Sequence, residues 1–189
     1  MTAAELDPPP NLVFYHTIEF GPGRVTPGWP VIIPIVDMMI DAMRSVDFAG
    51  KRVLDIGCRD GAMSFAAEKL GAAEIMGIDA DLPTENLAFL TRALNSQARF
   101  ESRNVFDVKP ETYGLFDVIL LAGVVYHLRY PFSGLRVVRD LLRDGGNPAC
   151  RDRHFYGRQP IATVTLPDRS GKPVWGIDIL HVFQHQGIQ

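Results

Sequence analysis

The sequence predicts an α/β fold whose core is a doubly wound parallel sheet. Apolar segments of strand length alternate with segments of helical period from residue 52 to residue 144, which is the pattern that right-handed βαβ crossovers require. The stretch VLDIGCRDG (53–61) ends an apolar run in two glycines, as a strand does where its following turn holds a nucleotide. The stretch FDVILLAG (116–123) is almost wholly apolar, as expected for a strand covered on both faces.

Length and composition are typical of one globular domain. The chain has 189 residues, a net charge of −3 and a pI near 5.9, so it lacks the global attraction to phosphate backbones of a basic protein. Two cysteines, Cys58 and Cys150, are too few for a disulfide framework and favour a reducing cytoplasm. The first residues lack the pattern of a secretory signal, and VIIPIV (31–36) is too short to span a membrane. We expect a cytoplasmic protein without a membrane segment.

The elements follow in order along three regions. Residues 1–33 are expected to form an irregular N-terminal cap or lid, and we call its aromatic, turn-rich part, residues 11–30, the lead-in. Residues 34–146 are the expected core. It opens with a helix over 34–46 whose apolar residues share one face and whose first turn suits Pro34. Strands are then expected at 52–56, 74–79, 99–105 and 116–123, and helices at 62–70, 83–95 and 131–144.

The glycines of the first strand-to-helix turn exclude two common nucleotide sites. Gly57 and Gly61 have two charged residues between them, so neither G-x-G-x-x-G nor the G-x-x-x-x-G-K-[ST] phosphate loop is present. A site without a pyrophosphate still needs a close turn, which these glycines provide. Asp79 ends the second strand at about the 20-residue distance where an acid binds ribose hydroxyls. Asp107 follows the third strand, where it can accept a hydrogen bond from an adenine amino group.

This arrangement resembles the class I S-adenosylmethionine-dependent methyltransferases, whose fold is Rossmann-like. Their D/E-x-G-x-G-x-G motif is matched by Asp55, Gly57 and Gly61, with Arg59 in place of the middle glycine. Two glycines in a strand–turn–helix also occur in many other α/β folds, but the order of Asp79, Asp107 and FDVILLAGVVYHL favours the methyltransferases. The resemblance implies S-adenosyl-L-methionine as the cofactor. The cofactor-binding residues that it implies are Asp55, Gly57, Cys58, Arg59, Gly61, Asp79, Ala80, Phe106, Asp107, Ala122, Gly123 and Tyr126.

Two further stretches narrow the resemblance. LLAGVVYHLRYP (120–131) is similar to the G-V-L-Y-H-x-R-x-P segment of the tRNA wobble-uridine carboxymethyltransferase group, and YHTIEFGPGRVTPGW (15–29) is similar to the region that precedes the core in its relatives. Together the resemblance covers residues 14 to 146. It implies an acceptor that is either a small molecule or a tRNA wobble uridine. A carboxylated cofactor needs extra basic and tryptophan residues, for which Arg24 and Trp29 are the only candidates in this chain. We therefore expect plain S-adenosylmethionine.

The loop after the fourth strand holds the candidate catalytic residues, because ligands lie beyond the carboxyl ends of such sheets. Tyr126 is expected to pack against the cofactor or to orient the nucleophile. His127 either accepts a proton near neutral pH or is a structural histidine. Enzymes that methylate amide-like nitrogens usually carry Asn/Asp-Pro-Pro-aromatic here, and its absence favours an oxygen or carbon acceptor. His16 is a second candidate base, with a lid histidine in contact with water as the alternative.

Other polar residues give weaker signals. Nothing near Cys58 marks it as a nucleophile, and the cysteines and histidines lack metal-ligand spacing, so no metal is expected. Arg136, Arg139 and Arg143 share one helical face. That face either contacts RNA phosphates or is a solvated surface.

Residues 147–189 depart from the family. A complete member continues with a fifth parallel strand, a helix and an antiparallel pair, whereas this chain reads NPACRDRHFYGRQP after Gly146. IATVTL (161–166) and IDILHVF (177–183) are candidate strands. Codons chosen for residues 151–157 give a family-like sequence when read one nucleotide later, so we interpret the tail as a frameshift product. The sheet would then be incomplete in its C-terminal half, with an exposed fourth strand unless the tail pairs with it. Activity would be weak or absent, and the alternative function is a cofactor-binding remnant without turnover.

Overall fold

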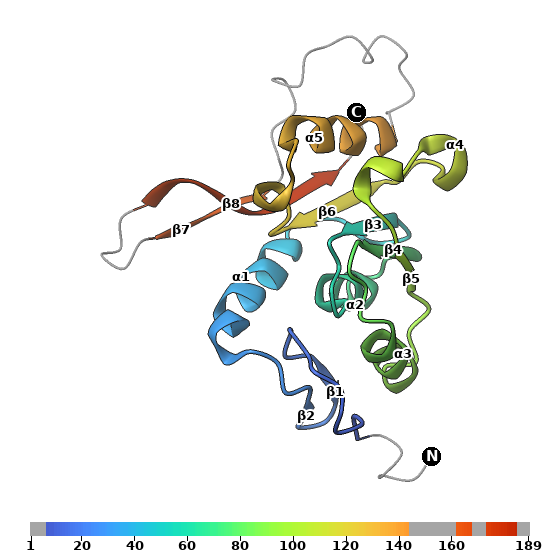
Figure 1. Ribbon diagram of the computed structural model, residues 1–189, viewed down its shortest axis with the longest axis vertical. Coiled ribbons are helices and arrows are strands. Elements are labelled where there is room, and N and C mark those ends of the chain that lie inside the picture. Colours follow the sequence, from blue (N-terminus) through green and yellow to red (C-terminus); the bar gives the residue numbers. More distant parts are fainter. Residues whose placement is uncertain (1–6, 144–161, 168–172, 185–189) are drawn as a thin grey trace.

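The computed structural model describes residues 7–143, 162–167 and 173–184 (Figure 1). These residues form a six-stranded sheet with the strand order β5-β4-β3-β6-β8-β7, together with a small separate hairpin near the N-terminus. Helices cover both faces of the sheet (Figure 1). The predicted α/β class is confirmed.

Four strands make up the parallel part of the sheet. They are β3 (Arg52–Ile56), β4 (Glu74–Asp79), β5 (Arg99–Ser102) and β6 (Val118–Ala122). β3 and β4 have the bounds that the sequence predicts. β5 ends three residues earlier than expected, because the chain soon turns into the 3-10 helix η3 (Val105–Asp107), which Asn104 caps by accepting a hydrogen bond from the Phe106 N–H at 3.0 Å.

Two apolar cores lie on opposite faces of the sheet, because successive strand residues point to opposite sides. Val53 and Leu120 belong to the core beneath α1 (Ile33–Met43), α2 (Ala62–Lys69) and α3 (Thr84–Ala93). Leu54 and Ile119 belong to the core beneath α5 (Pro131–Leu141). All four side chains are fully buried. The short helix α4 (Pro110–Tyr113), which precedes β6, was not expected from the sequence.

The lead-in is more regular than the sequence suggests. It contains an antiparallel hairpin of β1 (Glu19–Gly21) and β2 (Arg24–Val25), followed by the 3-10 helix η2 (Pro30–Ile32). Phe14 and Phe20 are buried in the first core and contact the ring of Phe89 on α3, at centroid distances of 6.2 and 5.3 Å. The lead-in is therefore packed onto the domain.

Both candidate strands of the tail are present, as β7 (Ala162–Pro167) and β8 (Pro173–Gln184). β8 pairs antiparallel with β6, from Val118↔Gln184 to Ala122↔Leu180, and β7 pairs antiparallel with β8. An antiparallel strand thus lies beside β6, where the resemblance predicts a fifth parallel strand, and the edge of β6 is paired. The expectations for residues 147–161, 168–172 and 185–189 lie outside the described residues.

Candidate functional site

The candidate site lies at the carboxyl edge of the parallel strands. β3, β4 and β6 end there, which brings together the segments that follow each of them. The N–H groups of Gly57 and Cys58 both donate to the carbonyl of Ile78 at the end of β4, at 2.8 and 3.1 Å. The turn after β3, residues 57–61, is called the glycine turn below.

The glycine turn uses left-handed backbone conformations at three positions. Gly57, Arg59 and Gly61 have φ values of 74°, 49° and 81°. For arginine this region costs about 1–2 kcal/mol, and three hydrogen bonds offset that cost. The Arg59 N–H donates to Asp79 Oδ2 at 3.0 Å, and its Nη1 donates to the carbonyl and the carboxylate of Asp81 at 2.9 Å each. Arg59 therefore adopts a backbone conformation that suits the middle glycine of the motif, and its side chain binds Asp81.

Gly57 lies against the loop that follows β6. A Cβ at this position would be 2.3 Å from Val124 Cγ2. Both the positive φ and this close approach therefore require glycine. The glycine turn is thus in direct contact with the loop after β6, which holds the candidate catalytic residues Tyr126 and His127.

Asp55 lies behind the turn on β3. It is 1% exposed and accepts a hydrogen bond from Ser64 Oγ at 2.7 Å. Burial, with a smaller contribution from the charge of Asp79, raises the pKa of Asp55 to about 6 against the opposing effect of the Ser64 hydrogen bond. A cationic group bound near the turn would favour the ionised carboxylate.

The residues expected to hold ribose and adenine lie along the same edge. Asp79 accepts the N–H groups of Asp81 and Arg59 through separate carboxylate oxygens, at 2.9 and 3.0 Å. A carboxylate has about four acceptor sites, so Asp79 retains capacity for ribose hydroxyls. Asp107 is exposed and Phe106 is half-buried.

The side chain of Cys58 is buried behind the turn, where its thiol donates a weak hydrogen bond to the Arg59 carbonyl at 3.9 Å. Its side chain is 3% exposed, and a Cβ built at Gly77 would be 3.0 Å from its sulfur. The thiol therefore points into the core. Burial raises its pKa well above the usual range, which agrees with the expectation that it is not a nucleophile.

Tyr126 and His127 lie at the exposed mouth of the site, on the 3-10 helix η4 (Val125–His127). Tyr126 is 63% exposed, and its ring lies 4.4 Å from that of His127 between centroids. Partial burial raises the pKa of Tyr126, and the neighbouring Tyr15 of the lead-in raises it further. The loop that carries Tyr126 also contacts the glycine turn, because Val124 lies against Gly57.

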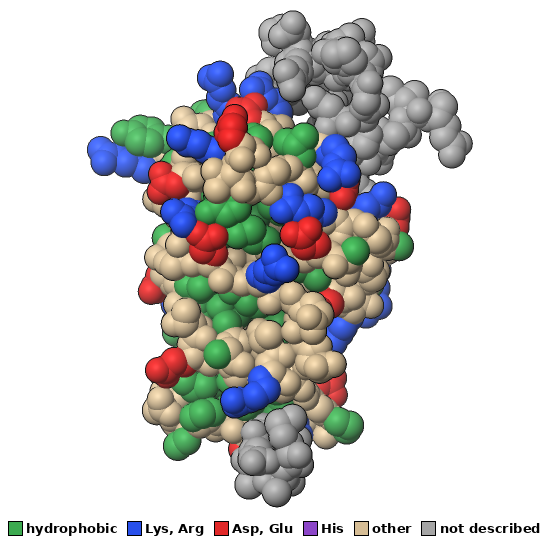
Figure 2. All heavy atoms as spheres, turned by 90° about the vertical axis from the view of Figure 1, so that its right-hand side faces the viewer, with side chains coloured by type: hydrophobic (Ala, Val, Ile, Leu, Met, Phe, Trp, Pro, Cys, Tyr) green, Lys and Arg blue, Asp and Glu red, His purple; other side chains and the backbone are tan. Residues whose placement is uncertain are grey.

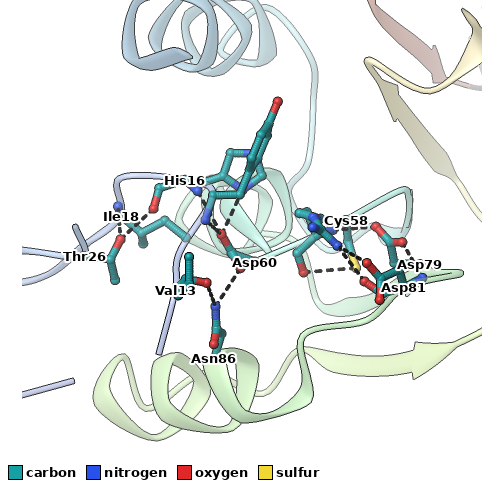
Figure 3. Close-up of polar contacts among 11 residues, drawn as sticks. Val13, His16, Ile18, Thr26, Cys58, Asp60, Asp79, Asp81 and Asn86 are labelled. Atoms are coloured by element: carbon teal, nitrogen blue, oxygen red, sulfur yellow. Dashed lines mark hydrogen bonds and ion pairs between the residues drawn. The ribbon is translucent and has the colours of Figure 1, made fainter. Parts of the chain in front are cut away.

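Sequence reasoning missed Asp60, which joins the glycine turn to the lead-in (Figure 3). Asp60 is 1% exposed, and its carboxylate accepts the N–H groups of Tyr15 and His16. A charged residue directly before Gly61, at the start of a buried helix, was the available signal. His16 is half-buried, with a side chain 13% exposed. Its role as a base or as a lid histidine in contact with water stays a prediction.

Several arginines singled out from the sequence have acidic partners. Arg24 pairs with Asp7 and lies over the ring of Phe20. On α5 and just beyond it, Arg139 pairs with Asp140 and Arg143 with Asp117. On the face shown in Figure 2, basic and acidic side chains are interspersed over the surface.

No described helix has the length and apolar character needed to cross a membrane. Within the same residues, no group of three or more His, Cys, Asp or Glu side chains is placed to hold a metal ion.

Comparison with known proteins identifies similar chains. A family model described as a methyltransferase domain matches residues 54–147. A tRNA U34 carboxymethyltransferase of Desulfotalea psychrophila is 30% identical over 134 residues, which are 69% of this chain and 40% of that protein. A ubiquinone biosynthesis O-methyltransferase of Ruegeria pomeroyi is 38% identical over 106 residues, 54% of this chain and 41% of that protein.

The chain spans about two fifths of the length of these curated relatives. Among solved structures, the [4+2]-cyclase SpnF matches with a TM-score of 0.50 and 22% identity, over 72% of this chain and 50% of that one. This likeness concerns the fold alone.

Proposed function

We propose that the chain, whose residues 54–147 match the model of a methyltransferase domain, binds S-adenosylmethionine at the glycine turn and transfers its methyl group to an oxygen or carbon acceptor. The observation that carries this proposal is the contact between the glycine turn and Asp79. The backbone of the turn donates to the carboxylate of Asp79, which would hold the ribose, so the two halves of the proposed cofactor site would be joined.

Each part of the site has a role toward the cofactor. Residues 55–61 would hold the methionine half, Asp79 the ribose, and Phe106 with Asp107 the adenine. Ala80 and Ala122–Gly123 would line the site at the ends of β4 and β6. The spare acceptor capacity of Asp79 fits this assignment.

The bound cofactor supplies a methyl group that its sulfonium sulfur has already activated. The chain mainly has to position the acceptor in line with the methyl carbon and take up the proton that the acceptor loses. Tyr126 would orient the acceptor at the mouth of the site. His127, exposed beside it, would receive the proton, because an imidazole is able to bind one near neutral pH.

The acceptor that we propose is either a small molecule or a tRNA wobble uridine, in the cytoplasm. The names of the two relatives support one alternative each. A methyl-transfer assay with labelled S-adenosylmethionine, run on separate tRNA and small-molecule pools, distinguishes them by the pool that becomes labelled.

Calorimetry with S-adenosylhomocysteine tests the cofactor site directly. The wild type should bind with micromolar or tighter affinity. Asp79→Ala should weaken binding at least about 10-fold, which corresponds to about 1.4 kcal/mol. Asp79→Asn keeps one carbonyl acceptor for the turn, so its affinity should lie between those of the wild type and Asp79→Ala. Asp37→Asn, on the exposed side of α1, serves as a matched control. Absence of binding, or equal binding by Asp79→Ala, would refute the assignment.

A second candidate function is cofactor binding without turnover. The antiparallel pairing of β8 with β6, in place of a fifth parallel strand, favours it. Binding of S-adenosylhomocysteine with no labelled product in either pool would support this alternative.

We propose that the chain consists of a cap over 1–33, a core over 34–146 and a tail over 147–189. We also propose that a frameshift produced the tail. The gene sequence tests the last point. An alternate frame that is closed by stop codons soon after Gly146 would exclude a frameshift.

A further inference from the structure

A buried carboxylate in the glycine turn holds three segments together (Figure 3). Asp60 Oδ2 accepts the backbone N–H groups of Tyr15 and His16, at 2.5 and 2.8 Å. Asp60 Oδ1 accepts from Asn86 Nδ2 at 3.1 Å, and Asn86 lies on α3. The lead-in, the glycine turn and α3 therefore share one acid that is 1% exposed.

The backbone of the lead-in is held from both sides at this point. Asn86 Nδ2 also donates to the carbonyl of Val13 at 2.8 Å. The carbonyl of His16 accepts from Thr26 Oγ1 at 2.7 Å, and that of Tyr15 accepts from the Trp29 N–H at 3.0 Å. The carbonyls of these lead-in residues thus accept hydrogen bonds from the lead-in itself or from α3. The N–H groups of Tyr15 and His16, by contrast, depend on Asp60. Without Asp60 these donors would be left unpaired, which folded proteins avoid.

The attachment also fixes a cluster of aromatic rings around Tyr15. The ring of Tyr15 lies 5.3 Å from that of Trp29 and 4.9 Å from that of His16. Gly57 of the same turn lies against Val124, two residues before Tyr126, so the lead-in and the loop after β6 both contact the glycine turn. His16 Nδ1 is buried and has no hydrogen-bond partner in the described part of the chain. A buried polar atom of this kind usually has a partner, and a bound ligand would be able to provide one.

We propose that Asp60 is a positioning residue that holds the lead-in on the glycine turn, so that Tyr15 and His16 form one side of the acceptor site opposite Tyr126. The identity of the site as an acceptor site rests on the proposed function, whereas the attachment of the lead-in does not. The glycine turn then contacts the methyl donor through its backbone, and it fixes the acceptor side through the carboxylate of Asp60.

Asp60→Asn tests the attachment, because asparagine cannot accept two N–H groups and the Asn86 amide as the carboxylate does. The readout is the pKa of His16, followed by its imidazole signals in NMR. In the wild type burial lowers this pKa from 6.5, and the negative charge of Asp60 partly opposes that effect. If the variant releases the lead-in, His16 becomes solvated and its pKa rises toward 6.5, which is the expected result.

If Asp60→Asn leaves the lead-in attached, the pKa of His16 should shift in the opposite direction. If the lead-in stays in place, loss of the Asp60 charge removes an effect that raises the pKa of His16, so that this pKa falls further. That result would overturn the proposal. Hydrogen exchange provides an independent measurement, and the amides of Tyr15 and His16 should exchange at least 10-fold faster in Asp60→Asn. Asp37→Asn is the control, and its exchange at these amides should match the wild type.

The acceptor side is tested with the pool that yields labelled product. Asp60→Asn and Tyr15→Ala should each raise the acceptor concentration for half-maximal rate at least 10-fold, and Asp37→Asn should not. Release of the lead-in with an unchanged acceptor dependence would overturn the assignment of the acceptor side. If the wild type neither binds S-adenosylhomocysteine nor labels a pool, the proposed function and the acceptor side that rests on it both fail. The NMR and exchange results still decide the attachment.

Discussion

The contact between Gly57 and Val124 gives a sharp test of how the glycine turn packs against the loop after β6. We consider the substitution Gly57→Ala. The new methyl carbon would lie 2.3 Å from Val124 Cγ2 in a backbone with φ of 74°. Carbon atoms in contact are about 3.5–4.0 Å apart, so the loop after β6 has to retreat by more than about 1 Å.

Two free-energy costs add in this variant. The left-handed conformation costs about 1–2 kcal/mol for a residue with a side chain. Overpacking costs about 1–3 kcal/mol in addition. Gly50→Ala separates the two, because Gly50 has φ of 69° and a Cβ there would have no atom within 4 Å. We therefore expect Gly57→Ala to lower the free energy of unfolding by about 2–5 kcal/mol and Gly50→Ala by about 1–2 kcal/mol.

Urea unfolding of the two variants and of a double-mutant cycle with Val124→Ala measures these costs. In the Val124→Ala background the steric overlap is gone, so Gly57→Ala should cost only about as much as Gly50→Ala. Equal costs of Gly57→Ala in both backgrounds would refute the contact. A cost of Gly57→Ala no larger than that of Gly50→Ala in the wild-type background would do the same.

The remaining predictions concern two buried groups near the turn. The pKa of Asp55 is raised from 3.8 to about 6, so the folded state binds its proton more tightly, and stability from this group is lost as pH rises from about 4 to 6. Asp55→Asn should flatten that part of the pH–stability curve and raise stability at pH 7 by at most roughly 3 kcal/mol; an unchanged curve contradicts the shift. Ser64→Ala, which removes a hydrogen bond that lowers this pKa, should move the transition to higher pH. Cys58, in a Cys150→Ser background, should react with a thiol reagent at least about 100-fold more slowly in the native state than in urea, because burial suppresses its thiolate; similar rates would place the thiol at the surface.

Local pattern was sufficient for the parallel part of the sheet. The apolar runs at β3 and β4 have strand length and are bounded by charged residues or glycine, so their ends were predicted to the residue. Helices α2 and α5 were predicted to begin at their observed first residues, and the other ends of α2, α3 and α5 were predicted to within three residues. The lead-in was less predictable, because aromatic residues and prolines without a period do not indicate which face is buried. Its hairpin depends on contacts with α3 that are distant in sequence.

The sequence by itself determined the position of the candidate site, because glycines after a buried strand and an acid at the end of the next strand are local features. Tertiary structure alone decided how the site is assembled. Asp60 and Tyr15 are 45 positions apart, and Gly57 and Val124 are 67 apart. No local pattern reports such contacts, because they depend on the packing of the lead-in and of the loop after β6 against one turn. The same holds for β8, whose apolar sequence predicts a strand, while its antiparallel pairing with β6 is set by which edge of the sheet is open to it.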